Sequence, residues 1–179
     1  KALVLAPTRE LALQIHDNFK EYGRNLDLRT TVIYGGVPQS KQVRALNQGV
    51  DILVATPGRL LDLVQQRKLT LAHVSYLVLD EADRMLDMGF VKDVKKIVAM
   101  VKTQRQTMFF SATMPKAIVS LSNDMLHNPV RIMVSPEEET IDRIEQSLYF
   151  VGKKKKIDLL VDLLRKNDMK SVLVFSRTK

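Results

Sequence analysis

The stretch YLVLDEAD, residues 76–83, joins a short apolar run to three acidic residues within four positions. A run of Tyr, Leu, Val and Leu is typical of a β-strand that is covered on both faces. Asp80, Glu81 and Asp83 follow this run directly. The stretch therefore predicts a buried strand that carries a concentrated negative charge at its carboxyl end.

Four further runs of the same apolar character lie along the chain. They are KALVLA (1–6), RTTVIYG (29–35), DILVAT (51–56) and QTMFFSA (106–112). Between the runs, apolar residues recur at three- and four-residue spacing, which predicts helices. The predicted helices cover residues 11–22, 37–48, 60–66, 90–101 and 115–127. Strands that alternate with helices at this spacing predict βαβ units and an α/β fold with a mainly parallel sheet.

The pattern changes after residue 130, which divides the chain into three predicted parts. Residues 1–130 form the α/β domain, and 131–146, rich in acids and poor in large apolar residues, form a linker. Residues 147–179 start a new strand–helix–strand unit, with strands at 147–151 and 171–175. Because the chain opens on one apolar strand and ends on another, we expect both ends to be cut from a longer protein.

The composition limits the classes of protein and site that the chain can represent. Its 179 residues allow one domain with a sizeable core, or one domain and a piece of another. A net charge of +8 favours a polyanionic partner, although this signal is weak by itself. The chain has no cysteine, which excludes disulfides and thiolate zinc sites and suits a reducing compartment. No apolar run approaches the roughly 18 residues of a membrane span, so we expect a cytoplasmic protein.

Each predicted strand of the first domain ends in a motif of polar or small residues. The motifs are PTRE (7–10), GG (35–36), TPGR (56–59), DEAD (80–83) and SAT (111–113). In a parallel sheet the carboxyl ends of all strands lie at one edge, where open α/β sheets bind ligands. The five loops are therefore predicted to meet along one edge of the sheet.

Three of these motifs, at 7–10, 35–36 and 56–59, suit an extended chain of phosphates. Residues 56–59 and residues 7–10 read most simply as helix starts, and the two glycines read as a tight turn. Free N–H groups at helix N-termini beside an Arg also bind phosphate, and glycine lets a ligand approach the backbone closely. Contacts of this kind would hold a nucleic-acid backbone with little base specificity.

The acidic motif suits a metal-bound nucleotide. A helix dipole favours one or two acids at its N-terminus, but it does not explain Asp80 at the end of a strand. An Asp in that place can hold Mg²⁺ that bridges nucleotide phosphates, and the neighbouring Glu81 can polarise an attacking water. Asp83 is predicted to pair with the hydroxyls of Ser111 and Thr113, which would couple the nucleotide site to loop movement.

With PTRELA, GG, TPGR, DEAD and SAT in this order and at this spacing, the chain resembles the DEAD-box family of ATP-dependent RNA helicases, in particular a bacterial member. The segment VFSRTK (174–179) looks like the first motif of the family's second domain. The resemblance covers essentially the whole chain. It implies a RecA-like first domain and the beginning of a second, with ATP and RNA bound across the cleft between them.

The resemblance also implies a role for each matching residue. Asp80 would bind Mg²⁺ through water, and Glu81 would activate the water that hydrolyses ATP. Asp83, Ser111 and Thr113 would link the ATP state to RNA binding and to unwinding of the duplex or remodelling of an RNA–protein complex. The residues implied to grip the RNA sugar-phosphate backbone are Pro7, Thr8, Arg9, Gly35, Gly36, Thr56, Gly58 and Arg59.

The chain lacks several features of the family, and the first is the G-x-x-x-x-G-K-[ST] loop, which occurs nowhere in the 179 residues. The family's upstream adenine-reading segment and the arginines of its second domain are also absent. We therefore expect an internal fragment, inactive by itself, of an RNA-dependent ATPase. Two alternatives stay open, namely a catalytically silent RNA-binding or regulatory module and a DNA helicase of a related superfamily.

Overall fold

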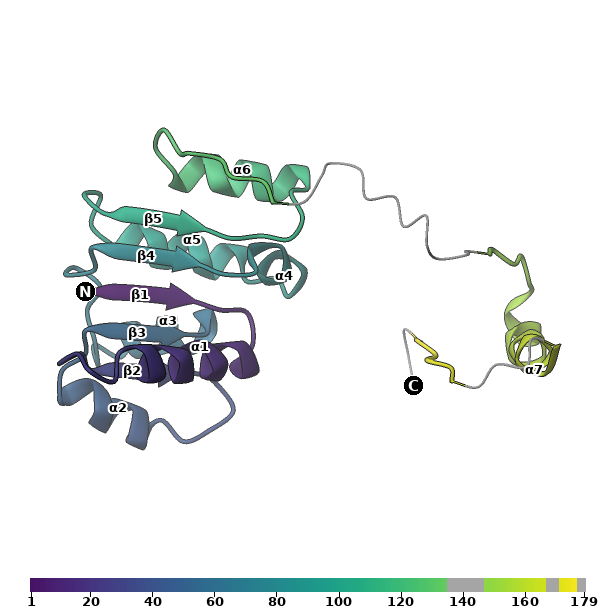
Figure 1. Cartoon of the computed structure of the whole chain (residues 1–179), viewed down its shortest axis with the longest axis horizontal. Coiled ribbons are helices and arrows are strands. Elements are labelled where there is room, and N and C mark those ends of the chain that lie inside the picture. The colour runs from purple at the N-terminus through teal and green to yellow at the C-terminus, as the bar shows by residue number, and fades with distance from the viewer. Residues whose placement is uncertain (135–146, 167–170, 177–179) are drawn as a thin grey trace. The chain divides into compact units, whose positions relative to one another are not determined.

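The computed structural model describes residues 1–134, 147–166 and 171–176, and the chain divides into two units, Lys1–Val130 and Arg131–Lys179. The first unit contains one parallel five-stranded sheet (Figure 1). Its strands are β1 (Ala2–Leu5), β2 (Thr30–Ile33), β3 (Ile52–Ala55), β4 (Tyr76–Leu79) and β5 (Gln106–Phe109). Their order in the sheet is β2-β3-β1-β4-β5. The predicted α/β fold with a parallel sheet is therefore confirmed.

The strands end almost flush, which brings the loops after them to one edge. Leu5 of β1 pairs with Ala55 of β3 and with Leu79 of β4. Ile33 of β2 and Phe109 of β5 occupy the matching last positions of their ladders. Each strand is shorter than predicted because its last residues leave the ladder and begin the loop. The prediction of one shared edge is confirmed, and we call it the carboxyl edge.

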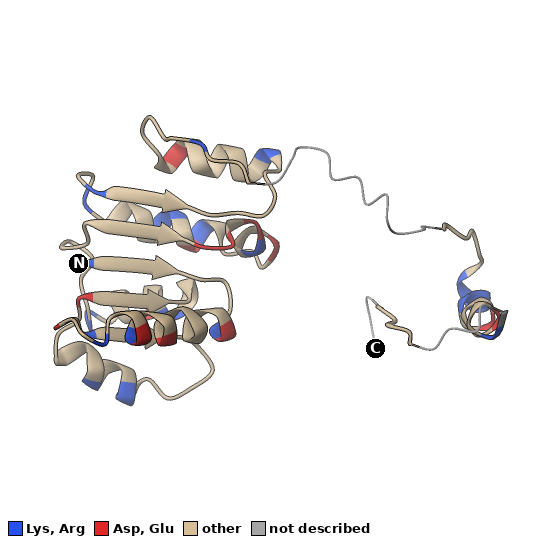
Figure 2. Ribbon diagram, in the orientation of Figure 1, with Lys and Arg blue, Asp and Glu red and all other residues tan. Residues whose placement is uncertain are grey.

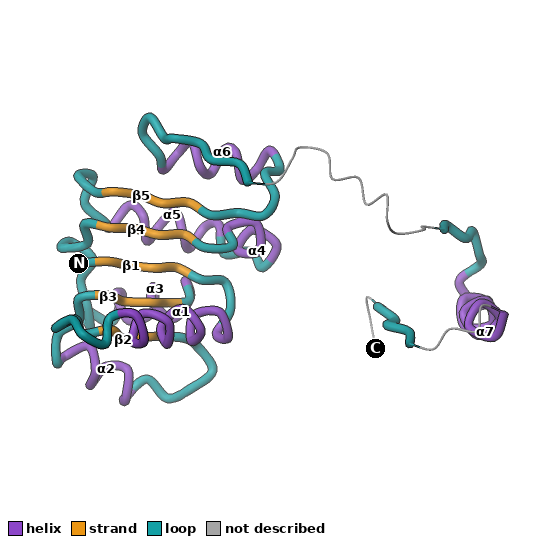
Figure 3. The backbone as a smooth tube through the Cα atoms, in the orientation of Figure 1, coloured by secondary structure: helices purple, strands orange, loops and turns teal. Residues whose placement is uncertain are grey.

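Six helices belong to the first unit. They are α1 (Arg9–Tyr22), α2 (Ser40–Asn47), α3 (Pro57–Gln65), α4 (Ala82–Asp87), α5 (Val91–Met100) and α6 (Lys116–Met125). Figure 3 shows how they alternate with the strands. Five of them lie where the spacing of apolar residues predicts helices. The helix α4 was not predicted, because its six residues are too short to show a period.

The sheet buries both faces, and its alternating side chains form two cores. Leu3, Leu53 and Leu77 point to the larger core, which also contains side chains of α3, α5 and α6. Val4 and Val54 point to the opposite face, where they pack with Ala12 of α1. The period of two along each strand thus explains why continuous apolar runs are needed. The result is a rigid platform under the carboxyl edge.

The second unit differs from its prediction. It contains a short 3₁₀ turn at Lys153–Lys155 and the helix α7 (Lys156–Lys166). The strands predicted at 147–151 and 171–175 are absent, and large apolar side chains there, such as Phe150 and Phe175, are exposed. A strand needs a partner for its backbone hydrogen bonds, and these residues have no ladder in the part of the chain that is described.

Other predictions for this unit fall partly outside the described residues. Residues 135–146 of the predicted linker and 177–179 of the VFSRTK segment are among those not described. The assignment of 147–179 to a second RecA-like domain therefore stays a prediction. Within the described ranges, no helix combines the length and the apolar character that a membrane crossing requires.

Candidate functional site

The acidic residues of the carboxyl edge lie at the end of β4, where Figure 2 shows the red loop that leads into α4. Glu81 adopts the left-handed conformation, with φ 49° and ψ 53°. For a residue with a Cβ this conformation costs about 1–2 kcal/mol, so the surroundings must hold it. They do so through backbone bonds, because Ala82 N donates to Phe110 O (3.0 Å) and Phe110 N donates to Leu79 O (2.8 Å). The turn is therefore fixed by the neighbouring strand.

Asp80 is a partly buried carboxylate in an unfavourable place for charge. Burial raises its pKa above the ordinary value, the N–H of Glu81 opposes this rise, and the charge of Glu81 adds to it. The Glu81 N–H donates to Asp80 Oδ1 at 2.9 Å. In the described chain, Asp80 Oδ2 has no donor. A bound cation would compensate the negative charge of Asp80 and make its ionised form favourable.

The groups around Asp80 fit only one kind of Mg²⁺ site, in which the protein supplies few of the ligands. The described residues hold no group of three or more side chains that could ligate a metal, so they form no all-protein cage. Mg²⁺ in nucleotide sites takes one or two carboxylates and fills its other positions with water and phosphate oxygens. Asp80, with one oxygen not hydrogen-bonded, suits such an ion. The nearby Glu81 carboxylate accepts a hydrogen bond from Arg84 Nη1 at 2.9 Å.

Asp83 is held much more firmly than Asp80. Its Oδ2 accepts hydrogen bonds from the N–H (2.9 Å) and from the hydroxyl (2.8 Å) of Thr113. Burial opposes the charge, but the hydrogen bonds from Thr113 and from the Arg84 N–H outweigh it and lower the pKa of Asp83. This contact links the start of α4 to the loop after β5. We call Asp83, Ser111 and Thr113 the clasp.

The predicted hydrogen bond from a hydroxyl to Asp83 is correct for Thr113, and for Ser111 it is wrong in its direction and in the atom that it joins. The Thr113 hydroxyl donates to the Asp83 carboxylate as predicted. The Ser111 hydroxyl instead accepts from the backbone N–H of Asp83 (3.2 Å) and donates to Thr113 O (2.7 Å). The sequence brings the right residues together, but a hydroxyl can donate or accept, and only the geometry decides which.

The loop after β1 is a capped helix start. Thr8 Oγ1 accepts a hydrogen bond from Leu11 N at 3.2 Å, as its position before α1 predicts. Pro7, just before it, is buried. The guanidinium of Arg9 lies 4.8 Å from the centre of the Tyr34 ring, a cation–π contact with the loop after β2. The first and second loops are thus in direct contact.

The glycines of the edge expose backbone rather than side chain. Gly36 has φ +78°, which only glycine adopts easily, and a Cβ at Gly35, Gly36 or Gly58 would meet no atom within 4 Å. Thr56 precedes α3 in extended conformation but makes no capping bond through its side chain, and Pro57 takes the first helical position. The backbone at the three glycines is therefore open to a ligand, whereas Thr56 and Pro57 are buried.

Arg59 is in a different situation from the one its motif suggested. Its side chain is only 12% exposed. Nη2 donates to Val37 O at 2.9 Å, and Nη1 donates to Gln42 Oε1 at 3.1 Å. Gln42 Nε2 in turn donates to Tyr34 O at 3.1 Å. The guanidinium therefore binds the loop after β2, and its predicted contact with an RNA phosphate stays a prediction.

Sequence reasoning missed Gln42 and Tyr34. Gln42 lies on α2, and its side chain is buried, with 8% exposed. Nothing in its position along the helix distinguishes it from a solvent-facing glutamine, and the signal is its contacts in space. Tyr34 immediately precedes the Gly35-Gly36 pair, so an aromatic residue before two glycines was the available hint.

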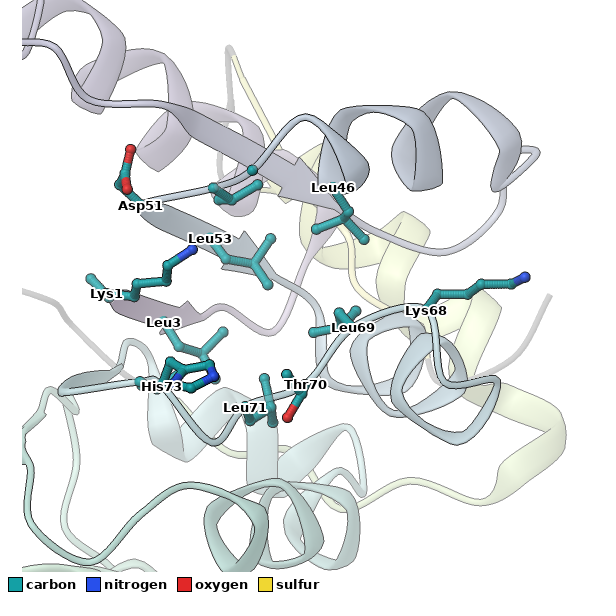
Figure 4. Close-up of a pocket in the computed structure, with 14 residues that line it drawn as sticks. Lys1, Leu3, Leu46, Asp51, Leu53, Lys68, Leu69, Thr70, Leu71 and His73 are labelled. Atoms are coloured by element: carbon teal, nitrogen blue, oxygen red, sulfur yellow. The ribbon is translucent and has the colours of Figure 1, made fainter.

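A cavity of about 220 Å³ lies away from all of these residues, at the amino ends of the strands (Figure 4). Its lining is mostly apolar and comes from β1, from the segment before β3 and from the segment before β4. The lining residues include Lys1, Leu3, Leu46, Asp51, Leu53, Lys68, Leu71 and His73. None of the predicted site residues is among the residues that line it. The candidate site is therefore the carboxyl edge, which is a surface.

Comparison with protein families gives one clear match. The family model described as DEAD/DEAH box helicase matches residues 1–121. That range contains all five motif loops and every predicted site residue.

Curated proteins and solved structures agree with this match. The chain is 46% identical over 179 residues to DEAD-box ATP-dependent RNA helicase 20 of Arabidopsis thaliana, covering 99% of the chain and 36% of that protein. It is 42% identical to the ATP-dependent RNA helicase RhlB of Xanthomonas axonopodis pv. citri, covering 100% of the chain and 32% of that protein. These relatives come from a plant and a bacterium, so the similarity does not single out a bacterial source.

Among solved structures, a hypothetical ATP-dependent RNA helicase from Sulfolobus tokodaii has a TM-score of 0.68 and 40% identity, covering 72% of the chain and 38% of that structure. The yeast DEAD-box splicing factor Prp28 has a TM-score of 0.68 and 39% identity, covering 71% and 30%. The chain spans about a third of the length of the curated relatives it matches.

Proposed function

The chain belongs to the DEAD/DEAH box helicase family, and we propose that its carboxyl edge serves an ATP-dependent RNA helicase. One observation carries this proposal: five motif loops from distant parts of the sequence meet at one edge of a parallel sheet. Relatives named as ATP-dependent RNA helicases support the reaction, namely ATP hydrolysis that drives RNA unwinding or remodelling of an RNA–protein complex.

The acids at the end of β4 would carry the hydrolytic chemistry. Asp80 Oδ2 would accept a hydrogen bond from a water bound to Mg²⁺, which would neutralise charge on the ATP phosphates. The Glu81 carboxylate would take the proton from the attacking water. The new bond joins the water oxygen to the γ-phosphorus, and the bond from that phosphorus to the β,γ-bridging oxygen breaks. Arg84 keeps the Glu81 side chain in place through its 2.9 Å contact.

The clasp would transmit the nucleotide state to the loop after β5. Asp83 lies two residues from Glu81 on the short helix α4, and its carboxylate holds Thr113 through two hydrogen bonds. A small shift of the acidic turn would therefore move the 111–113 loop. Coupling of this kind requires an element with two discrete arrangements, and the clasp is the candidate for that element.

The other loops would bind the RNA backbone. The N-termini of α1 and α3 offer free N–H groups, and Gly35, Gly36 and Gly58 let phosphates approach the main chain. Contacts to sugar and phosphate carry no direct sequence information, so we expect little base specificity. The net charge of +8 predicts affinity that falls steeply as salt rises.

The test is phosphate release from Mg-ATP by the protein that carries this chain, with RNA and with DNA of the same sequence. Glu81→Gln should lower RNA-stimulated release by about 10²–10⁴-fold, the usual contribution of a general base. The control Glu21→Gln changes an exposed acid at the end of α1 and should leave release unchanged. Normal hydrolysis by Glu81→Gln would overturn the assignment. Release that responds to the DNA and not to the RNA would favour a DNA-directed enzyme, and RNA binding without release would favour a silent binding module.

A further inference from the structure

Gln42 has a buried side-chain amide whose nitrogen and oxygen both make hydrogen bonds to groups at the carboxyl edge. Gln42 Nε2 donates to Tyr34 O, and Gln42 Oε1 accepts from Arg59 Nη1. Arg59 Nη2 also donates to Val37 O. Burial of a polar side chain costs free energy unless the side chain is hydrogen-bonded. Here the Gln42 amide makes one hydrogen bond to the main chain of the loop after β2 and one to the side chain of Arg59 on α3.

The partners of this pair lie on both sides of the two glycines. Tyr34 comes directly before Gly35, and Val37 comes directly after Gly36. In the described chain, the glycines themselves make no hydrogen bond, and Gly36 has a positive φ. Glycine loses more conformational freedom on ordering than any other residue, so the loop depends on its flanks for a fixed shape. The flanks are the atoms that Gln42 and Arg59 bind.

We propose that Gln42 and Arg59 act as a positioning pair that holds Gly35 and Gly36 in the shape that binds an RNA phosphate. The inference rests on the proposed RNA-binding function of this edge. Arg59 then acts through the loop and not by contact with phosphate, which agrees with its small exposed fraction. The pair also fixes Tyr34, on whose ring Arg9 lies, so it aligns the loops after β1, β2 and β3 as one surface.

The expected effect is a loss of preorganisation. Without the pair the protein still folds, but the two glycines must be ordered when RNA binds, and this lowers affinity without removing any phosphate contact. The salt dependence separates the two roles. Loss of one phosphate contact to a single strand lowers the slope of log K against log salt by about 0.7, whereas a positioning residue leaves the slope unchanged.

The test uses the full chain, a fluorescein-labelled ten-nucleotide oligouridylate and Gln42→Leu. The matched control is Gln65→Leu, at an exposed glutamine at the end of α3. Affinity should fall about tenfold in Gln42→Leu at unchanged salt slope, and the control should match the wild type. Order parameters of the Gly35 and Gly36 amides should fall from about 0.85 to below about 0.6 without RNA.

A second pair of variants keeps the test decisive if Gln42→Leu folds poorly. Arg59→Lys keeps the charge but loses the two-point fork, so it should reproduce the loss of affinity and the mobile glycines. Gln42→Glu keeps an acceptor for Arg59 and loses the donor to Tyr34 O, so its effect should be intermediate.

Unchanged order parameters in Gln42→Leu and Arg59→Lys would overturn the positioning pair, whatever happens to RNA. A lower salt slope in Arg59→Gln, which removes the charge, would also overturn it, because that result marks a direct phosphate contact. A wild-type chain that fails to bind the oligouridylate at low salt would overturn the proposed RNA function and, with it, the RNA role of the pair. The order parameters then show whether the pair still holds the loop.

Discussion

The two halves of the carboxyl edge differ in how well their polar groups are stabilised by contacts within the protein. In the half after β1, β2 and β3, the side chains are satisfied: Thr8 caps a helix, Arg9 lies on an aromatic ring, and Arg59 is bound within the protein. In the half after β4 and β5, Asp80 carries a charge that its surroundings disfavour, and Glu81 has a left-handed backbone. The satisfied half presents main chain for a ligand to bind, and the unsatisfied half presents groups ready for chemistry.

The contrast is sharpest between two carboxylates three residues apart. Burial raises the pKa of Asp80, whereas the pKa of Asp83 is lowered because hydrogen bonds from Thr113 and its neighbours outweigh burial. Perturbed carboxylates are common at functional sites. The hydrogen bonds separate these two, because in the described chain Asp80 accepts only the N–H of Glu81, whereas Asp83 accepts two bonds from Thr113. The following variants test this division, beginning with the largest expected effect.

Removing the clasp should destabilise the half of the carboxyl edge that follows β4 and β5. Asp83→Ala deletes the acceptor of both Thr113 bonds, and we expect a loss of about 1.5 kcal/mol of unfolding free energy because the site is partly exposed. Urea unfolding measures it. Because folding lowers the pKa of Asp83, its contribution is fully present above the unfolded-state pKa of about 4 and is lost below it, as the pH falls through the lower folded-state pKa.

The control for the clasp is Asp87→Ala, at an exposed aspartate of the same helix. That variant should stay within about 0.5 kcal/mol of the wild type. If both variants are equally destabilised, or if the effect of Asp83→Ala is the same at pH 3 and pH 7, the clasp is not what stabilises this half.

The glycine pair of the satisfied half offers an internal comparison. Gly36→Ala should lower the unfolding free energy by about 1 kcal/mol, because φ +78° strains any residue with a Cβ even though the space around it is open. Gly35→Ala has the same open space without a positive φ and should be nearly neutral. Thermal unfolding of both variants decides the matter, and equal melting temperatures would argue against the left-handed geometry of Gly36.

Gly58 should behave in the opposite way. It occupies an early position of α3, where a Cβ would meet no neighbour within 4 Å. Alanine is a better helix former, so Gly58→Ala should raise the unfolding free energy by about 0.5–1 kcal/mol. A destabilised Gly58→Ala would mean that the glycine is needed for the fold. A stabilised variant leaves ligand access as the reason for its presence.

The smallest expected effect is at Asp80. Asp80→Asn removes a charge that burial disfavours and should stabilise the protein by on the order of 0.5 kcal/mol at neutral pH, while phosphate release is lost. The sign follows from the raised pKa: in the wild type, ionisation of Asp80 lowers stability as the pH rises from about 4 through its folded-state pKa. Chemical unfolding of both proteins between pH 4 and pH 8 measures the difference, and a less stable Asp80→Asn would contradict this account.

Most of the first unit could be predicted from the sequence because its signals are local. Continuous apolar runs identify five strands, and the apolar period identifies five of the six helices. The exception, α4, is short and starts at a strained Glu81, so neither period nor a capping bond marks it. The predicted strands of the second unit fail for a different reason, since pairing is a property of the partner as well as of the segment.

The location of the candidate site could be predicted, but only part of its hydrogen bonding could. Parallel strands must end at one edge, so the motifs had to meet there. The bond between Thr113 and Asp83 was predicted, but the intramolecular partners of Arg59 were not, because its motif gives no sign of which groups the guanidinium binds. One of these partners, Gln42, lies 17 residues away from Arg59 and has no motif of its own.

The central claim is that one half of the carboxyl edge, after β1, β2 and β3, binds RNA and the other half carries the chemistry. The affinity of the chain for RNA tests this claim most directly. We would titrate the labelled oligouridylate against the wild type, Gly58→Ala and Glu81→Gln in one experiment. The account predicts about tenfold weaker binding for Gly58→Ala, from lost backbone access, and binding within about twofold of the wild type for Glu81→Gln. Equal weakening in both variants, or none in Gly58→Ala, would contradict the division of the edge.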